Sequence, residues 1–255
     1  MSGGALSALS DPPSPADSKT ILQKEAGVQT LINRLKTPEE PVSREGTGLL
    51  IIQAPGERYR LQFRLIARGP EALRMEIFDP FGRPMVYIFS YQGTIRLFSI
   101  PQKKEIPFHL PSLEPWSSFS AISSTEILKI FWGRVPFFPY NTYQTTPDRE
   151  KGKPEIKFEF RGSVLQEIWL TTDPFSVIRS RITSPSREGE IEIFFSDFSE
   201  AAGNRTPMKC EIKDGRGEYT LTLRYDAVIL RPEIPDEIFE FPQVTEPPSS
   251  ETKTP

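Results

Sequence analysis

The side chains that most often carry nucleophilic catalysis or bind transition metals are scarce in this sequence. One histidine, His109, and one cysteine, Cys210, occur among 255 residues. An intrachain disulfide is therefore impossible, and a zinc site built from several His or Cys ligands is excluded. A Ser–His–acid triad would need His109, which lies between Pro107 and Pro111 without a nucleophile-elbow motif. We interpret His109 as a partly exposed loop residue, and we expect no metal and no other cofactor.

Paired carboxylates are the remaining source of general acid–base chemistry, as in glycosidases. The chain has 34 Asp and Glu residues, but most of them alternate with apolar residues and therefore belong to the solvated faces of strands. No P-loop, GxGxxG, HExxH or EF-hand pattern occurs. The sequence therefore favours a protein that is not an enzyme. An enzyme would require carboxylates that converge inside the fold.

A phenylalanine stands at the tip of the turn Asp79-Pro80-Phe81-Gly82, which joins two expected strands. Phe81 has two interpretations: it folds back onto the sheet, or it projects into solvent as an apolar wedge for a lipid or a partner. Asp173-Pro174-Phe175 repeats the first three letters without the glycine. We interpret that second segment only as a turn that connects two strands.

Most of the chain alternates between apolar and polar residues with a period of two. The clearest run is 58–68, with Tyr, Leu, Phe, Leu and Ala on one side and mainly Arg on the other. Around ten short strands with Gly, Pro and Asp turns predict one large antiparallel sheet, curled or closed, in a mainly β fold. The expected strands begin near Gly46 and continue at 58–68, 73–77, 84–91, 93–100, 102–107, 155–161, 163–171, 176–183, 188–196, 206–213 and 217–226. The outer arginines of 58–74 are expected to face solvent, with anionic head groups as the alternative partners. They are Arg58, Arg60, Arg64, Arg68 and Arg74.

Two amphipathic or apolar helices are expected to cover the concave apolar face of this sheet. The first spans 17–36, with Ile21, Val28 and Leu35 on one face, and ends before Pro38. The second spans 123–132, where Ser123 and Glu126 form a capping box and Gly133 follows the last turn. Residues 135–140 are too rich in proline for a helix or a strand. Residues 141–154 are expected to form a polar loop.

Composition limits the class of protein and its division into domains. A net charge of −3 and a pI near 5.5 disfavour a nucleic-acid partner. The 18 Phe, 7 Tyr and 3 Trp suffice for a core, and no segment has the ~20 apolar residues of a membrane-spanning helix. We expect a flexible tether over 1–16, a single domain over 17–242 and a disordered tail over 243–255. The N-terminus resembles a mature bacterial lipoprotein whose lipidated first Cys is replaced by Met1, with an ordinary disordered terminus as the alternative.

Several motifs over residues 20–240 resemble the bacterial LolA/LolB lipoprotein carrier family, and the LolB-type outer-membrane receptors more than the LolA type. The motifs are Gly46-Thr47-Gly48, the strand and turn 73–82, the strand at Gly93, the helix end 130–136 and the segment 234–239. The chain departs from the family in three respects. It lacks a lipobox Cys, its segment 135–154 is long and aromatic, and its proline content is high.

The resemblance implies a half-open antiparallel barrel whose apolar interior receives the acyl chains of lipoproteins beneath a helical lid. The residues that would line this cavity are Leu61, Phe63, Leu65, Met75, Ile77, Ile95, Leu97, Leu128 and Phe131. Phe81 occupies the position of the family's membrane-contacting residue. The implied function is a non-enzymatic periplasmic lipid or lipoprotein binder that helps to place lipoproteins in the outer membrane, anchored through a lipidated N-terminal Cys absent here. Its partners would be acyl chains, the inner leaflet of the outer membrane and a periplasmic carrier protein.

The alternative is a structural or assembly lipoprotein of the outer membrane. In that protein the same fold would have a filled core and would bind another envelope protein through its rim. A cavity too small for an acyl chain would favour this alternative.

Overall fold

A computed structural model describes residues 27–36, 43–69, 72–91, 94–106, 122–148, 155–184, 189–201, 204–231 and 233–242. The chain divides into two compact units, Met1–Glu39 and Glu40–Pro255. In the first unit, residues 27–36 form a helix, which confirms the second half of the helix expected over 17–36. Residues 17–26, both expected tails and His109 lie outside the described residues. The predicted domain boundaries and the predicted position of the first helix over the sheet stay predictions.

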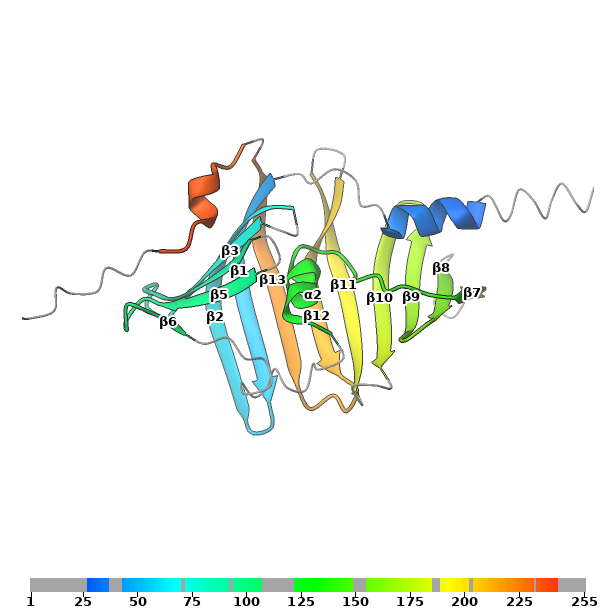
Figure 1. Ribbon diagram of the computed structural model, residues 1–255, viewed down its shortest axis with the longest axis horizontal. Coiled ribbons are helices and arrows are strands. Elements are labelled where there is room, and N and C mark those ends of the chain that lie inside the picture. The colour runs from blue at the N-terminus through cyan, green and yellow to red at the C-terminus, as the bar shows by residue number, and fades with distance from the viewer. Residues whose placement is uncertain are drawn as a thin grey trace, which may run out of the picture. The chain divides into compact units, whose positions relative to one another are not determined.

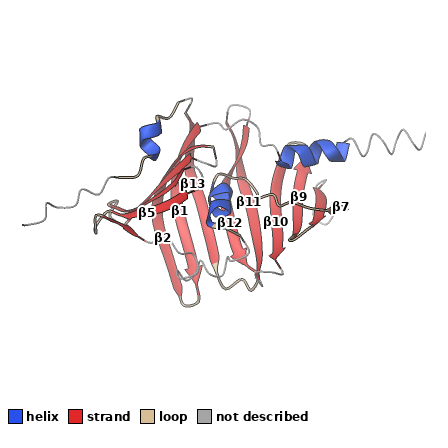
Figure 2. Cartoon of the chain, viewed as in Figure 1, coloured by secondary structure: helices blue, strands red, loops and turns tan. Residues whose placement is uncertain are grey.

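The second unit is built on one antiparallel sheet of 13 strands, shown in Figures 1 and 2. The strands lie in the order β6-β5-β4-β3-β2-β1-β13-β12-β11-β10-β9-β8-β7. Their bounds are β1 Ser43–Ala54, β2 Glu57–Arg68, β3 Ala72–Phe78, β4 Pro84–Tyr91, β5 Thr94–Ser99, β6 Lys104–Ile106, β7 Thr142–Asp148, β8 Glu155–Arg161, β9 Leu165–Thr172, β10 Phe175–Ser184, β11 Gly189–Ala201, β12 Asn204–Asp214 and β13 Thr220–Leu230.

Neighbouring strands are sequential except at the junction of β1 with β13, where two runs of consecutive hairpins meet. The strands β6 and β7 are the two edges and do not pair with each other within the described residues, so the sheet is not closed. Figure 1 shows the strand direction rotating strongly between β10 and β5, as expected for a twisted sheet of many strands. The predicted mainly β fold with one large curled antiparallel sheet is confirmed.

The helix α2, Ser124–Phe131, covers one face of this sheet, which we call the inner face (Figure 2). Its N-terminus is the predicted capping box: Ser123 Oγ accepts from Glu126 N at 3.3 Å, and Ser123 N donates to Glu126 Oε2 at 2.6 Å. Gly133 follows the helix with a φ of 80°, a conformation that other residues rarely adopt. The predicted second helix and both of its end signals are therefore confirmed.

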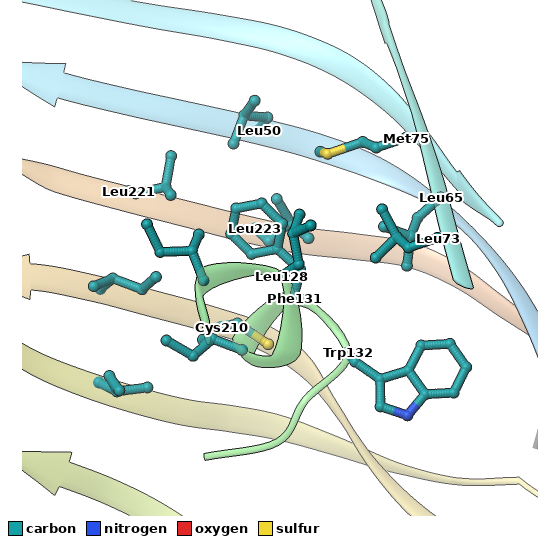
Figure 3. Close-up of a cluster of buried hydrophobic side chains, with 14 of the residues drawn as sticks. Leu50, Leu65, Leu73, Met75, Leu128, Phe131, Trp132, Cys210, Leu221 and Leu223 are labelled. Atoms are coloured by element: carbon teal, nitrogen blue, oxygen red, sulfur yellow. The ribbon is translucent and has the colours of Figure 1, made fainter. Parts of the chain in front are cut away.

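Alternation along the strands sends apolar side chains to the inner face. On β2, Phe63, Leu65 and Ala67 are buried there, whereas Arg64 and Arg68 lie on the opposite, outer face. The inner-face core joins α2 to residues of strands from both halves of the sheet (Figure 3). Because strands as distant in the sheet as β3 and β10 contribute to one core, the sheet curves around α2.

The segment after β13 accounts for an apolar patch on the outer face. Its 3-10 helix η4, Asp236–Phe239, packs Phe239 against Ile66 and Ala72. Phe241 lies between Phe89 and Phe98, with ring centroids 5.4 and 5.7 Å away. Ile66 occupies an outward position of β2, so η4 explains why an isoleucine interrupts the row of arginines there.

The polar loop expected over 141–154 is wrong in its first half, because Thr142–Asp148 forms β7 and pairs with β8. The strand escaped prediction because it lies at the edge of the sheet and buries little: Thr142, Tyr143 and Gln144 are exposed. Pro147 also speaks against a central strand, but an edge strand tolerates proline. The expected segments match the other strands, so β7 is the strand that was missed, and the sheet of 13 strands exceeds the expected number of around ten.

Candidate functional site

The structure brings most of the predicted ligand-binding residues together on the inner face. Phe63, Leu65, Met75, Leu128 and Phe131 belong to one buried core, against which Ile77 and Ile95 pack. Leu97 is also buried, and Leu61 is half-buried. The apolar face that the sequence predicts therefore exists. The binding of a ligand to it stays a prediction.

In this structure α2 itself occupies the apolar face. Its residues Ile127, Leu128, Ile130 and Phe131 are all at most 3% exposed. Figure 3 shows the labelled core side chains gathered around the helix. A hydrocarbon chain that used the same surface would therefore compete with α2.

The segment after α2 crosses the inner face toward the edge strand β7 (Figure 1). It is held by Gln166 on β9, whose Nε2 donates to Pro136 O at 2.6 Å and whose Oε1 accepts from Phe138 N at 3.3 Å. Phe137 and Tyr140 of this segment pack with each other and with Phe160 on β8, edge to face or tilted, at centroid distances of 4.9–5.8 Å. As expected from its prolines, this segment forms neither helix nor strand.

Tyr225 on β13 anchors the C-terminal end of α2. Its hydroxyl donates to Phe131 O at 2.6 Å, and its ring lies edge-on to Phe63 at 5.2 Å. The ring lies against Gly46, where an added Cβ would approach the ring atoms to 2.7 Å. Burial raises the pKa of Tyr225, so its hydroxyl stays neutral and able to donate. The glycine of the Gly46-Thr47-Gly48 motif thus makes room for the anchor.

Arg44 is the residue of this region that the sequence analysis missed. It is 6% exposed, and its Cζ lies 3.8 Å from the centroid of the Trp132 ring, just after α2. Its pKa is lowered by burial. A signal was present in the sequence: counting back by twos from the buried Leu50 through Gly48 and Gly46 places residue 44 on the inner face.

The single cysteine lies close to this arginine and is unreactive. Cys210 on β12 is free and buried, and burial raises the pKa of its thiol to about 12. A thiol is nucleophilic only as the thiolate, so Cys210 is unreactive at neutral pH. Among the described residues, no group of three or more His, Cys, Asp or Glu side chains could hold a metal ion.

The turn between β3 and β4 presents Phe81 to solvent. Asp79 Oδ1 accepts from Phe81 N at 2.8 Å and from Arg83 N at 2.9 Å, and its Oδ2 accepts from Arg83 Nε at 2.7 Å. These hydrogen bonds, led by that from the Arg83 backbone, lower the pKa of Asp79. Phe81 is 84% exposed at the tip of this turn, and Met85 nearby is also exposed. Of the two interpretations of Phe81, the projecting side chain is correct.

The turn that begins Asp173-Pro174-Phe175 behaves differently. It connects β9 to β10 as predicted, and Thr171 Oγ1 donates to Pro174 O at 2.6 Å. Phe175 is the first residue of β10 and is half-buried. The shared letters therefore do not place the two phenylalanines alike.

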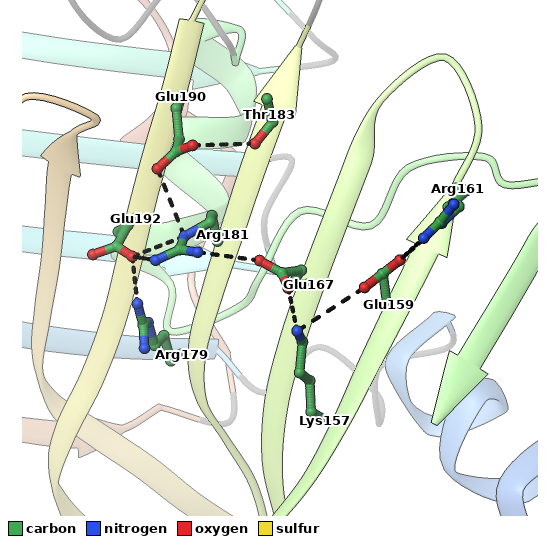
Figure 4. A network of polar contacts seen from close by, with 9 residues as sticks. All are labelled: Lys157, Glu159, Arg161, Glu167, Arg179, Arg181, Thr183, Glu190 and Glu192. Carbon is green, nitrogen blue, oxygen red and sulfur yellow. Dashed lines mark hydrogen bonds and ion pairs between the residues drawn. The ribbon is translucent and has the colours of Figure 1, made fainter. Parts of the chain in front are cut away.

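The charges of the outer face compensate one another. Arg64 pairs with Glu45 at 2.7 Å, Arg74 pairs with Glu76 at 2.7 Å, and Arg68 pairs with Asp236. A second network spans β8 to β11 (Figure 4) and joins Lys157, Glu159, Arg161, Glu167, Arg179, Arg181, Glu190 and Glu192. Arg58 and Arg60 are exposed. All five arginines and the carboxylates lie on the outer face as expected, but Arg74 is only 23% exposed because Tyr87 and Phe89 cover its guanidinium.

None of the helices in the described part of the chain has the length and apolar content needed to cross a bilayer.

No protein-family model matches the chain, and neither does any curated protein. Solved structures do match. A LolA superfamily protein from Nitrosomonas europaea aligns with a TM-score of 0.56 and 18% identity, over 84% of this chain and 97% of that one.

Two further solved structures share the fold. A putative outer membrane lipoprotein-sorting protein domain from Vibrio parahaemolyticus aligns with a TM-score of 0.55 and 9% identity, over 82% of this chain and 94% of that one. A DUF1329 family protein from Desulfovibrio piger aligns with a TM-score of 0.60 and 14% identity, over 85% and 96% respectively. At these identities the likeness establishes a fold like that of the LolA superfamily. The closer resemblance to LolB stays a prediction.

Proposed function

We propose that this chain is a non-enzymatic periplasmic carrier of lipids or lipoproteins that takes acyl chains onto its inner face and helps to place lipoproteins in the outer membrane. The observation that carries the proposal is a continuous apolar face, curved around one eight-residue helix. The similarity in fold to a putative outer membrane lipoprotein-sorting protein domain from Vibrio parahaemolyticus supports the same role.

An exchange between α2 and an acyl chain is energetically balanced. The four buried apolar side chains of α2 contribute roughly 6–12 kcal/mol, at about 1.5–3 kcal/mol for each. A saturated chain of about 14 methylenes gains on the order of 11 kcal/mol, at about 0.8 kcal/mol for each methylene. Because the two gains are of similar size, loading and release are both accessible, as a carrier requires.

Phe81 supplies the membrane contact in this proposal. Its exposed ring would enter the inner leaflet of the outer membrane, and Met85 lies on the strand that follows the same turn. Burial of one phenylalanine contributes only about 1.5–3 kcal/mol, which suits a transient contact during delivery. Stable attachment would come from a lipidated N-terminal Cys, and delivery would begin from a periplasmic carrier protein.

A structural or assembly lipoprotein is the second candidate, and the packing of α2 against the inner face favours it. With the face filled by the chain's own residues, the protein would bind another envelope protein through its rim. The two candidates differ in one requirement: only the carrier has to displace α2.

Competition between α2 and ligand provides the test. The purified chain is examined by native mass spectrometry for bound lipid and titrated with a fluorescent C16 acyl probe. Phe131→Ala weakens the hold of α2 on the inner face, so we expect it to tighten probe binding. The matched control, Phe158→Ala, removes a buried ring of β8 outside that core and should not tighten binding. A wild-type chain without bound lipid, together with no probe binding by either variant, would favour the filled-core candidate.

A further inference from the structure

An arginine stands in the apolar face where a charge is least expected. Arg44 lies on β1 opposite Ala67 and Leu230, and its side chain shares the inner face with Leu50. An arginine remains protonated inside proteins. A buried charge is expensive unless it is paired. Arg44 therefore needs a compensating group.

The described neighbours of Arg44 carry no negative charge. The thiol of Cys210 is protonated, and Tyr225 is neutral and donates its proton to Phe131 O. Trp132 covers one face of the guanidinium as a cation–π partner. Within the described residues no ion pair joins Arg44 to an acid.

The unpartnered atoms of Arg44 form one edge of the guanidinium. Its Nε and Nη2 are both buried and have no hydrogen-bond partner among the described residues. These two N–H groups make the fork that binds both oxygens of a carboxylate or a phosphate. Arg74 and Arg179 also have an unpartnered buried Nε, but their Nη2 atoms pair with Glu76 and Glu192. Arg44 differs from them because its whole fork lacks an acceptor.

The compensation that Arg44 does have depends on α2. Trp132 is the C-terminal cap residue of the helix, and the negative end of the helix dipole lies at the same place. When an acyl chain displaces α2 from the inner face, Arg44 loses its contact with the Trp132 ring and with the negative end of the helix dipole. The loaded protein therefore has a stronger need for an anion at this position than the empty one.

We propose that Arg44 is the counter-ion for the head group of an amphiphile, so that the ligand is a hydrocarbon chain with a carboxylate or phosphate at its end. The chain lies on the inner face in place of α2, and the anion accepts hydrogen bonds from Nε and Nη2 of Arg44. This inference rests on the proposed function, because it uses the same apolar face. It adds a charge requirement that a purely apolar cavity lacks.

Probes with one chain and different head groups test the inference. Oleate, oleoyl lysophosphatidate and uncharged oleyl alcohol are titrated into the full chain at pH 8, with inorganic phosphate alone as a fourth ligand. We expect one or both anionic amphiphiles to bind about ten- to a hundredfold more tightly than the alcohol, the gain of a charge-assisted pair. The tighter of the two identifies a carboxylate or a phosphate head group. Competition by inorganic phosphate alone would point to a free phosphate as the source of the anion.

Three variants assign the charge preference to Arg44. In Arg44→Met the ratio of oleate to alcohol affinity should fall to about one, and in Arg44→Lys, which keeps the charge without the fork, it should take an intermediate value. Arg64→Met, on the outer face, should keep the wild-type ratio. Thermal unfolding confirms that each variant is folded, and Arg44→Lys provides the test if Arg44→Met is not.

The possible failures are distinguishable. Equal affinity of the wild type for anionic and uncharged chains would overturn this inference and leave the proposed function standing. An equal fall of the ratio in Arg64→Met would also overturn it. If neither oleate nor oleyl alcohol binds, the proposed function falls, and this inference falls with it.

Discussion

The two faces of the sheet differ in whether their charged side chains have partners of opposite charge. On the outer face, arginines and lysines stand beside glutamates at pairing distance, as in the network of Arg181 with Glu167 and Glu192. On the inner face Arg44 lies among apolar side chains, and no described acid pairs with it. Self-compensated charge stabilises a surface and needs no ligand. Uncompensated charge in an apolar face indicates that something else supplies the partner.

Among substitutions on the two faces, the largest loss of stability is expected on the inner face. Phe63→Ala should lower the free energy of unfolding by about 3–5 kcal/mol, because it leaves a cavity in the core around α2. Gln62→Ala, one residue earlier and exposed on the other face, should change it by less than about 0.5 kcal/mol. Urea unfolding measures both variants. Equal effects would mean that the two faces do not differ in packing.

A smaller effect is expected at the anchor of α2. Gly46→Ala should lower the free energy of unfolding by about 1–3 kcal/mol, because its new methyl group meets the ring of Tyr225. Tyr225→Phe should lower it by about 1–3 kcal/mol, because Phe131 O loses its donor. The new methyl group displaces the ring and with it the hydroxyl that binds Phe131 O, so both changes cost the same hydrogen bond and the double variant should lose less than the sum. Thr47→Ala, exposed between the two glycines, is the control, and strict additivity would refute the shared anchor.

The charges of the outer face predict a modest dependence of stability on pH. The hydrogen bond from Arg64 holds the pKa of Glu45 below its ordinary value of 4.5. A lowered folded pKa stabilises the fold fully above the ordinary value, and this contribution is lost as the pH falls through the folded pKa. The wild type should therefore lose more stability than Glu45→Gln between about pH 5 and about pH 3, by less than about 1 kcal/mol for this partly exposed pair. Arg64→Gln should reduce this difference in thermal melts at both pH values, and the part that remains is expected from Arg231, which also pairs with Glu45 at 3.0 Å. An undiminished difference would exclude the pair of Arg64 with Glu45 as its source.

The smallest change in stability is expected at Phe81, which contacts solvent. Phe81→Glu should leave the melting temperature and acyl-probe binding unchanged but weaken association with liposomes about ten- to a hundredfold, since one buried phenylalanine contributes about 1.5–3 kcal/mol. Phe175→Glu, in the other Asp-Pro-Phe turn, should instead lower stability, because Phe175 is half-buried. Cosedimentation with vesicles measures the association. Unchanged association of Phe81→Glu would reject its membrane role.

Local pattern was sufficient for most elements of the sheet and for α2. Strands that bury one face, such as β2 and β13, follow from period-two alternation, and the helix follows from Ser123, Glu126 and Gly133, whose effects are local in the chain. The edge strand β7 could not be found in this way. It buries so little that its residues alternate weakly, and its hydrogen bonds come from β8, seven or more residues further along the chain.

Residue types and their periods therefore specified a mainly β chain with an apolar face, a capped helix and a phenylalanine at a turn. The pairing of β1 with β13, which joins residues about 180 positions apart, depends on folding of the whole sheet. Through that pairing Gly46 and Arg44 come to lie beside Tyr225 and beneath the end of α2. Long-range packing decides whether a side chain at an alternating position contacts solvent, an acid or a helix. The surroundings of Ile66 and Arg44 therefore depend on the tertiary structure.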